Sequence, residues 1–253
     1  MKNFLISFLM ISLIISGLFA KASELLVDKY MDLSGAQTTI ESMGSQLINN
    51  IKQRDVMYGK KTDPKNIELF EEVFDSDKGV QKFKKYLSNE FDNDTLKQII
   101  AYYKTPIAKK IVQANIDSLD PDAQAKLLRF MANLSNNPPS NQRVEIIKKV
   151  IQKLKLSQNA IDIFKLTMDF FNKQNPNNSL AQDKINQILP LVKQGLEQRL
   201  FITYLYVYKD IENKELESML LFYDTESGQK EIQVVQNGLK QIIQDGFNRA
   251  FKK

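Results

Sequence analysis

The stretch YVYKDIENKELESMLLFYDTESGQK, residues 206–230, has a counterpart 120 residues earlier in YLSNEFDNDTLKQIIAYYKTPIAKK, residues 86–110. The two align without a gap and share six of 25 positions, where composition alone would give roughly one or two. The identical pairs are Tyr86 and Tyr206, Asn93 and Asn213, Leu96 and Leu216, Tyr103 and Tyr223, Thr105 and Thr225, and Lys110 and Lys230. Further upstream, YMDLSGAQ from Tyr30 resembles KLKLSQNA from Lys153, at a shift of 123. These matches predict a tandem duplication.

Each copy of this stretch carries one apolar stripe at the spacing i, i+3, i+4 and i+7, which is typical of a helix packed on one side. The stripes are Leu96, Ile99, Ile100 and Tyr103 in the first copy, and Leu216, Met219, Leu220 and Tyr223 in the second. Tyr102 and Phe222 precede the final tyrosines. We therefore expect an aromatic wedge at the end of each helix.

Polar residues on both sides of each stripe indicate helix ends. Asn93 and Asn213 precede the stripes, where a short polar side chain can cap free backbone N–H groups. Thr105 and Thr225 follow and can cap a second helix, with Pro106 favourable at its first position in copy one and Glu226 favourable to the helix dipole in copy two. Ala108 and Gly228 are small enough to let the second helix lie close to the first. Each stretch is interpreted as a joint between two helices.

The remaining chain follows helical periodicity almost throughout. Thr203–Tyr208, TYLYVY, alternates like a strand but also continues a helical stripe, and we predict a helix there. Asp63 and Asp120 each precede a proline and predict helix starts, whereas Pro190 should kink or break its helix. The predicted fold is all-α, with two tandem helical-bundle repeats packed together. They span residues 23–134 and 144–253 and are joined by a linker, SNNPPSNQR, at 135–143.

The N-terminus predicts export. Lys2 precedes an apolar or small run from Phe4 to Ala20, followed by Ala20-Lys21-Ala22, which matches an A-x-A cleavage site. We expect residues 1–22 to be a signal peptide and the mature chain to be periplasmic or extracellular. A membrane anchor is the alternative, but the run is short for a bilayer core of about 30 Å. No integral membrane segment is expected after it.

Composition narrows the function. The chain has no histidine or cysteine, so zinc, haem and copper sites are not expected, and we predict no cofactor and no metal. The formal charge is +5 and falls to +3 without Lys2 and Lys21. Because this excess is spread along the chain without a basic block, nucleic acid is not an expected partner.

The second copy resembles the signature of the bacterial domain-of-unknown-function 2059 family, approximately E-L-x-x-h-h-x-F-Y-x-S-x-x-G-x-K with h apolar. The matching residues are Glu215, Leu216, Phe222, Tyr223, Gly228 and Lys230, with Thr225 in place of the usual serine. The first copy keeps Leu96, Tyr103, Thr105, Pro106 and Lys110, but has Tyr102 for Phe and Ala108 for Gly. The resemblance implies an exported helical bacterial protein and supplies no mechanism.

Two short patterns suggest sharper chemistry. Ser227 and Lys230 form an S-x-x-K, but S-D-N and K-T-G partners are missing and copy one has Ile107 for the serine. Asp75, Asp77 and Gly79 resemble the start of a calcium loop, but its twelfth position is Tyr86 instead of a glutamate. Helix capping is the favoured interpretation of Asp75 and Asp77.

Two functional classes stay open. A carboxylate-based envelope hydrolase needs two acids across a cleft, and Glu90 and Asp210 occupy equivalent repeat positions. The favoured class is a non-enzymatic binding or structural module that engages a component of the bacterial envelope. Leu221 lies off the apolar stripe, so its helix is either buried between the copies, which we favour, or offered to a partner.

Overall fold

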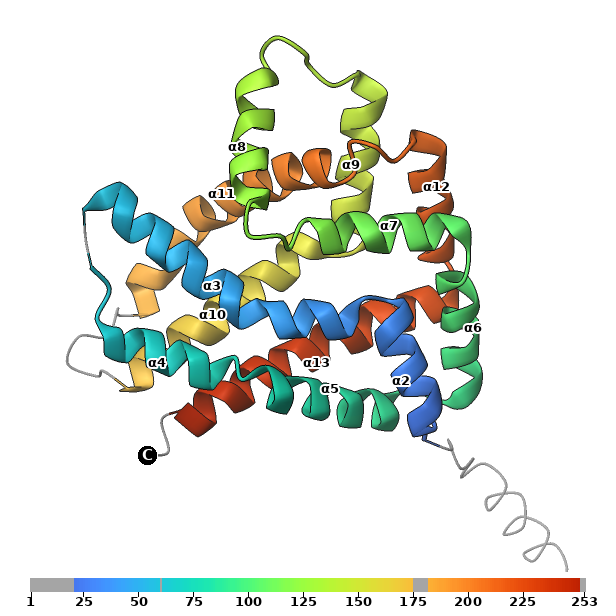
Figure 1. Cartoon of the computed structure of the whole chain (residues 1–253), viewed down its shortest axis with the longest axis horizontal. Helices are drawn as coiled ribbons and strands as arrows, with labels where there is room; N and C mark the ends of the chain where they lie inside the picture. The colour runs from blue at the N-terminus through green and yellow to red at the C-terminus, as the bar shows by residue number, and fades with distance from the viewer. Residues whose placement is uncertain (1–20, 60, 175–181, 251–253) are drawn as a thin grey trace, which may run out of the picture.

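The computed structural model describes residues 21–59, 61–174 and 182–250, and confirms the predicted all-α class for them (Figure 1). The first helices are α2 Glu24–Leu33, α3 Ala36–Tyr58, α4 Pro64–Val73, α5 Ser76–Glu90, α6 Asn93–Tyr103, α7 Pro106–Asp117 and α8 Ala123–Asn133. They are followed by α9 Asn141–Lys153, α10 Leu156–Gln174, α11 Gln182–Val207, α12 Asn213–Phe222 and α13 Glu226–Ala250. The predicted signal peptide lies outside the described residues except for Lys21 and Ala22.

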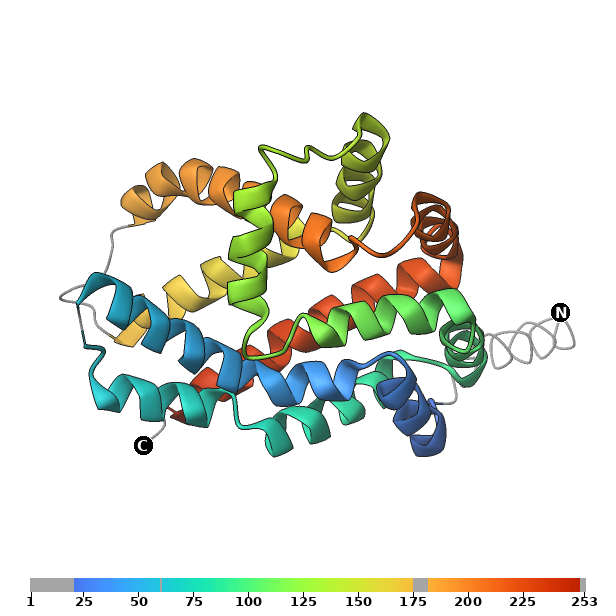
Figure 2. The same cartoon turned by 45° about the horizontal axis from the view of Figure 1, so that its top comes forward.

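Helix α13 runs through the centre of the molecule (Figures 1 and 2). It packs against α4, α5 and α6 of the first half of the chain, which comprises α2–α8, and also against α10 of the second half, which comprises α9–α13. Helix α7 of the first half packs in turn against α12 of the second. In each half, the helix that follows the aromatic joint, α7 or α13, therefore packs against helices of the other half.

The hydrophobic cores follow this exchange. The largest core is built from α2, α3, α5 and α6, yet Val234 and Ile242 of α13 belong to it. A second core is built from α9, α11 and α12 and includes Ile111 of α7. Since each core contains side chains from both halves, the two halves interlock.

Helix boundaries and backbone geometry correspond at a shift of 120 residues. Helix α2 ends at Leu33 and α9 at Lys153, and the next helices begin at Ala36 and Leu156. Gly35 and Lys155, between those helices, both have left-handed backbone geometry, with φ of 70° and 51°. This geometry favours a shift of 120 residues for these segments over the shift of 123 that was inferred from the sequence stretches beginning at Tyr30 and Lys153.

Backbone carbonyls at helix ends are satisfied in corresponding places. In the first half, Ala22 N donates to Ser88 O at 3.1 Å and Phe91 O at 3.0 Å, and Ser23 N donates to Asn93 Oδ1 at 2.9 Å.

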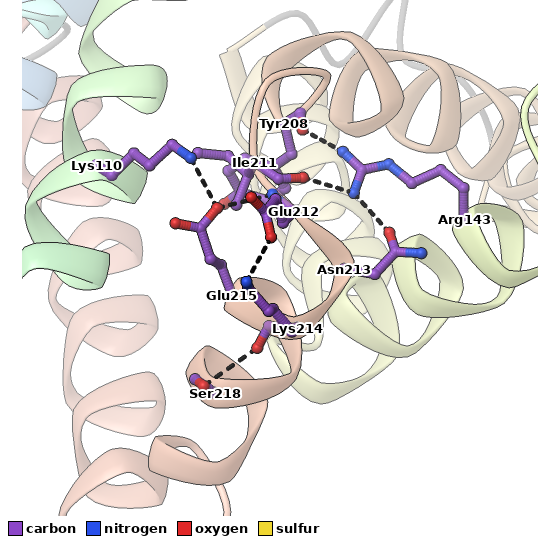
Figure 3. Close-up of polar contacts among 9 residues, drawn as sticks. All are labelled: Lys110, Arg143, Tyr208, Ile211, Glu212, Asn213, Lys214, Glu215 and Ser218. Carbon is purple, nitrogen blue, oxygen red and sulfur yellow. Dashed lines mark hydrogen bonds and ion pairs between the residues drawn. The ribbon is translucent and has the colours of Figure 1, made fainter.

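In the second half, the Arg143 guanidinium donates to Tyr208 O, to Ile211 O at 2.9 Å and to Asn213 Oδ1 at 2.9 Å (Figure 3). These acceptors lie 120 residues after Ser88, Phe91 and Asn93. The Arg143 side chain thus donates to the same three positions in the second half to which the backbone N–H groups of Ala22 and Ser23 donate in the first half.

Several local expectations are confirmed. Thr203–Tyr208 lies in helix apart from its last residue, since α11 ends at Val207. Asp63 caps α4 by accepting from Lys65 N at 2.9 Å. Thr105 and Thr225 accept from Ala108 N at 3.2 Å and from Gly228 N at 3.1 Å at the starts of α7 and α13.

Other local expectations are wrong. Asp92 and Glu212 are the N-caps in place of Asn93 and Asn213. The amide oxygens of these two asparagines instead accept from Ser23 N and from the Arg143 guanidinium. Asp120 does not cap α8, which begins only at Ala123. Of the two effects expected of Pro190, a kink or a break, the break does not occur, since α11 continues through it. Helix α9 begins at Asn141, inside the predicted linker.

Ala22 belongs to the folded structure. Its side chain is 3% exposed and lies in the first core, and its carbonyl accepts from Ser88 Oγ at 3.0 Å. Cleavage after Ala22, as the A-x-A pattern predicts, would remove a residue of the core.

Candidate functional site

The aromatic residues of the two joints meet each other. Tyr102 stacks on Phe222 with ring centroids 3.7 Å apart and an interplanar angle of 2°. The hydroxyls of Tyr103 and Tyr223 lie 3.4 Å apart. Since both pairs join positions 120 residues apart, the joints form one central contact between the halves.

The other motif residues have packing or capping positions. Leu96 and Leu216 are fully buried, one in each of the two larger cores. A Cβ at position 228 would lie 2.3 Å from the carbonyl oxygen of Phe222, so only glycine allows this approach of α13 to α12. Lys110 pairs with Glu215 at 2.7 Å, and Glu215 also accepts from the Glu212 N–H at 2.8 Å (Figure 3). Lys230 lines a surface pocket with Thr95 and other mainly polar residues.

A buried acid, Glu231, lies directly behind this aromatic contact. It is 3% exposed, and its Oε1 accepts from Tyr103 Oη at 2.7 Å and from Tyr30 Oη at 2.9 Å. The Tyr223 hydroxyl can donate to Tyr103, which extends the chain of hydroxyl groups. Two tyrosines from separate parts of the fold therefore donate to one carboxyl group, and Tyr223 is linked to it through Tyr103.

No cation compensates this carboxyl group among the described residues, where no ion pair involves Glu231. Burial raises the pKa of Glu231 to about 7, although the hydrogen bonds from Tyr103 and Tyr30 oppose the rise. Burial and then the charge of Glu231 raise the pKa values of Tyr30, Tyr103 and Tyr223. The tyrosines thus stay neutral donors while Glu231 changes charge near neutral pH.

A cavity of about 240 Å³ adjoins this group. Glu231, the three tyrosines and Asn159 line it, and the rest of the wall is apolar except for Ser34, Thr39 and Gln236. Glu231 Oε2 and Asn159 Oδ1 are both buried without a hydrogen-bond partner. An unsatisfied buried acceptor costs about 1 to 3 kcal/mol, and more when charged. Two residues that line the cavity therefore each have one buried acceptor that the protein leaves unused.

The corresponding positions of the other half contain no such group. Position 111 corresponds to Glu231 and is isoleucine, and position 150 corresponds to Tyr30 and is valine. Both side chains are buried in the second core. An apolar pair therefore fills the equivalent place in the fold, so the acid is not a requirement of this helix packing.

Glu231, Tyr30 and Asn159 were not among the site residues predicted from the sequence. A signal for Glu231 was present, because Gly228, Glu231, Val235, Gly238 and Ile242 follow the spacing of one helical stripe. An acid among small and apolar residues on such a stripe indicates a buried charge. Tyr30 lies 201 residues from Glu231 along the chain, and no local pattern predicts that contact.

The sharper sequence patterns have structural explanations. Ser227 donates its hydroxyl to Gln98 Oε1, so this serine is engaged with an amide. Asp75 caps α5 by accepting from Lys78 N at 3.0 Å, and Asp77 lies in the first turn of the same helix. Within the described ranges, no group of three or more acidic side chains could hold a metal ion.

Glu90 and Asp210 lie at the ends of helices that belong to different cores. Glu90 is the last residue of α5, and Asp210 follows α11 and lines a surface hollow that includes Lys110.

Leu221 is 67% exposed, so the expectation that it is buried between the copies is wrong.

In the part of the chain that the structure describes, no helix has the length and apolarity needed to cross a membrane.

A family model described as "Uncharacterized protein conserved in bacteria (DUF2059)" matches residues 80–132. This match runs from α5 into α8 and includes residues 86–110, the earlier of the two related stretches; it does not extend to residues 206–230. No curated protein and no solved structure matches the chain.

Proposed function

We propose that this protein is an exported, non-enzymatic binding protein whose cavity beside Glu231 holds a small ligand. The observation that carries this proposal is the pair of buried, unpartnered acceptors, Glu231 Oε2 and Asn159 Oδ1, on one cavity. Buried polar groups in native proteins are almost always satisfied, and exceptions often mark functional sites. A bound ligand would satisfy both atoms.

The apolar counterpart of the site supports the same reading. Ile111 and Val150 occupy the corresponding positions and fill the second core. Apolar side chains can therefore fill this position in the fold, whereas Glu231 lowers the stability of the fold when it is ionised. A group that costs stability and is not needed for packing is best explained by function.

A tandem duplication explains how the two sites diverged. Its support is the correspondence at 120 residues in helix starts, in left-handed Gly35 and Lys155, and in the carbonyls bound by Ala22 and Arg143. In this proposal one half retained a plain core and the other acquired a ligand cavity.

Export is proposed from the N-terminal sequence pattern, with periplasmic or extracellular localisation and a role in the bacterial envelope. The family match, described as conserved in bacteria, fits this setting. Because Ala22 is a core residue, we place processing at or before the bond between Ala20 and Lys21. This refines the boundary expected from A-x-A.

The test is recovery of the ligand. The protein is purified under native conditions from an envelope extract and analysed by native mass spectrometry, followed by identification of small molecules released on unfolding. We expect a bound small molecule that is released unchanged, and its loss from a Val235→Phe variant, whose larger side chain fills the cavity. Leu221→Glu, at an exposed position, is the matched control and should retain the ligand.

The competing hydrolase is tested on the same preparations with peptidoglycan, glycan and ester substrates. Turnover that Glu90→Gln, Asp210→Asn or Glu231→Gln abolishes would contradict the proposal. An empty wild-type cavity after recovery from the extract would contradict it as well.

A further inference from the structure

The hydrogen-bonding groups left free in the cavity define what a ligand must offer. Tyr30 and Tyr103 already donate to Glu231 Oε1, and the Tyr223 hydroxyl can donate to Tyr103. The buried side-chain atoms left without a partner there are both oxygen acceptors, Glu231 Oε2 and Asn159 Oδ1. A complementary ligand therefore brings hydrogen-bond donors.

The charge of the site defines the sign of the ligand. Ionised Glu231 has no lysine or arginine beside it among the described residues, and its contacts are neutral hydroxyls. Bringing an unpaired carboxylate into a protein interior is costly, whereas a paired one is compensated by its counter-ion. A ligand that carries a positive charge supplies that missing partner.

The walls and size define the rest of the molecule. The apolar lining consists of Ala36, Ile40, Phe83, Leu154, Leu156, Ile232, Val235 and Leu239. The volume of about 240 Å³ is below the range of about 300 to 1,000 Å³ typical of sites for drug-sized ligands. Thr39, which is exposed, also lines the cavity and leaves it open to solvent. The body of the ligand is therefore small and apolar.

We propose that this cavity binds a primary ammonium group carried on a small apolar body, with the ammonium nitrogen donating to Glu231 Oε2 and Asn159 Oδ1. The proposal rests on the proposed function and adds the chemical class of the ligand. An ammonium has three donors, so two can reach these acceptors and a third remains for water or a neighbouring polar group. Tyr30, Tyr103 and Tyr223 also line this cavity, and an aromatic ring attracts a cation that lies over its face.

The experiment is calorimetric titration of the full mature protein at pH 8 with n-butylammonium, and with n-butanol as the uncharged probe of similar size. We expect n-butylammonium to bind at least tenfold more tightly than n-butanol. Glu231→Gln should remove that preference while keeping an acceptor for Tyr30 and Tyr103. Glu226→Gln, an exposed acid on the same helix, is the control and should leave both affinities unchanged.

The pH dependence gives a second readout. Tyr30, Tyr103 and Tyr223 face Glu231 and remain neutral because burial raises their pKa values, so Glu231 is the titrating group. A protonated Glu231 must lose its proton to pair with the ammonium. The affinity should therefore fall about tenfold per pH unit below about pH 7 and stay level above it.

Each outcome is decisive. Equal binding of both probes, or binding that survives Glu231→Gln, overturns the ammonium assignment while leaving a ligand cavity. Failure of n-butylammonium to bind wild-type protein also overturns it, and ligand recovery from the extract then shows separately whether the proposed function stands. Thermal unfolding of the Glu231→Gln variant confirms that it is folded before it is compared.

Discussion

Replacing Glu231 with glutamine should make the protein more stable at alkaline pH. Burial raises the pKa of Glu231 from its ordinary value of 4.5 to about 7. At about 1.4 kcal/mol per pKa unit, ionised Glu231 costs the folded state about 3 kcal/mol above pH 7. Glutamine keeps an oxygen for Tyr30 and Tyr103 but carries no charge, so Glu231→Gln should raise the free energy of unfolding by about 3 kcal/mol at pH 8.

The sign of the pH dependence follows from proton binding. A carboxyl whose pKa is higher in the folded state binds more protons when folded, so stability falls as the pH rises. Below pH 4.5, Glu231 is protonated in both the folded and the unfolded state and carries no charge penalty. Between pH 4.5 and about 7 the free energy of unfolding falls as the unfolded state loses this proton first, and above about pH 7 the full penalty of the buried charge is present. Other acids also titrate in this window, and the difference between wild type and Glu231→Gln isolates this one.

Urea unfolding of both proteins from pH 5 to pH 8, followed by far-ultraviolet circular dichroism, measures this difference. The two curves should lie close together at pH 5 and separate by about 3 kcal/mol at pH 8, with wild type the less stable. Glu226→Gln removes an exposed acid from the first turn of α13, so it should be less stable than wild type by at most about 1 kcal/mol and should show no gain at pH 8. A Glu231→Gln variant that is less stable than wild type at pH 8 would refute the reasoning, because it would show that the carboxylate stabilises the fold.

Five further results are expected. Gly228→Ala should destabilise by at least about 2 kcal/mol because its Cβ meets the backbone of α12, whereas Gly195→Ala, with open space around its Cβ, should stabilise its helix by about 0.5 to 1 kcal/mol in thermal unfolding. Arg143→Ala should cost about 3 kcal/mol in urea unfolding, since it leaves two helix-end carbonyls without their donor. Tyr103→Ala should cost about 3 to 5 kcal/mol; full stability would show that this ring is not a structural wedge. Intact mass of the exported protein should show that Ala22 is retained, and an N-terminus after Ala22 would exclude its role in the core.

The local features of the fold were predictable from the sequence because they depend on neighbouring residues. The stripes ending at Tyr103 and Tyr223 and the threonine caps are set by spacing within one or two turns. Errors arose where a second element competes for a cap: Asn93 accepts from Ser23, so the neighbouring Asp92 caps α6.

The candidate site was not predictable in the same way. Its carboxyl group and Tyr30 meet across 201 residues, and this contact exists only because α13 packs against the first half. The amino-acid sequence places Glu231 on an apolar helical stripe, but it does not indicate which side chains surround it. The exposure of Leu221 has the same origin, since the packing partners of α12 leave that side of the helix uncovered.

The central claim is that the cavity beside Glu231 is a ligand site for a small ammonium compound. A crystal structure of the mature protein at pH 8, soaked with n-butylammonium at a concentration shown by calorimetry to saturate it, tests this most directly. The account predicts density for the butyl chain along Ile40 and Val235, with the nitrogen about 2.7 to 3.0 Å from Glu231 Oε2. Density for water alone in the cavity, with Glu231 Oε2 bonded to a protein group, would contradict it.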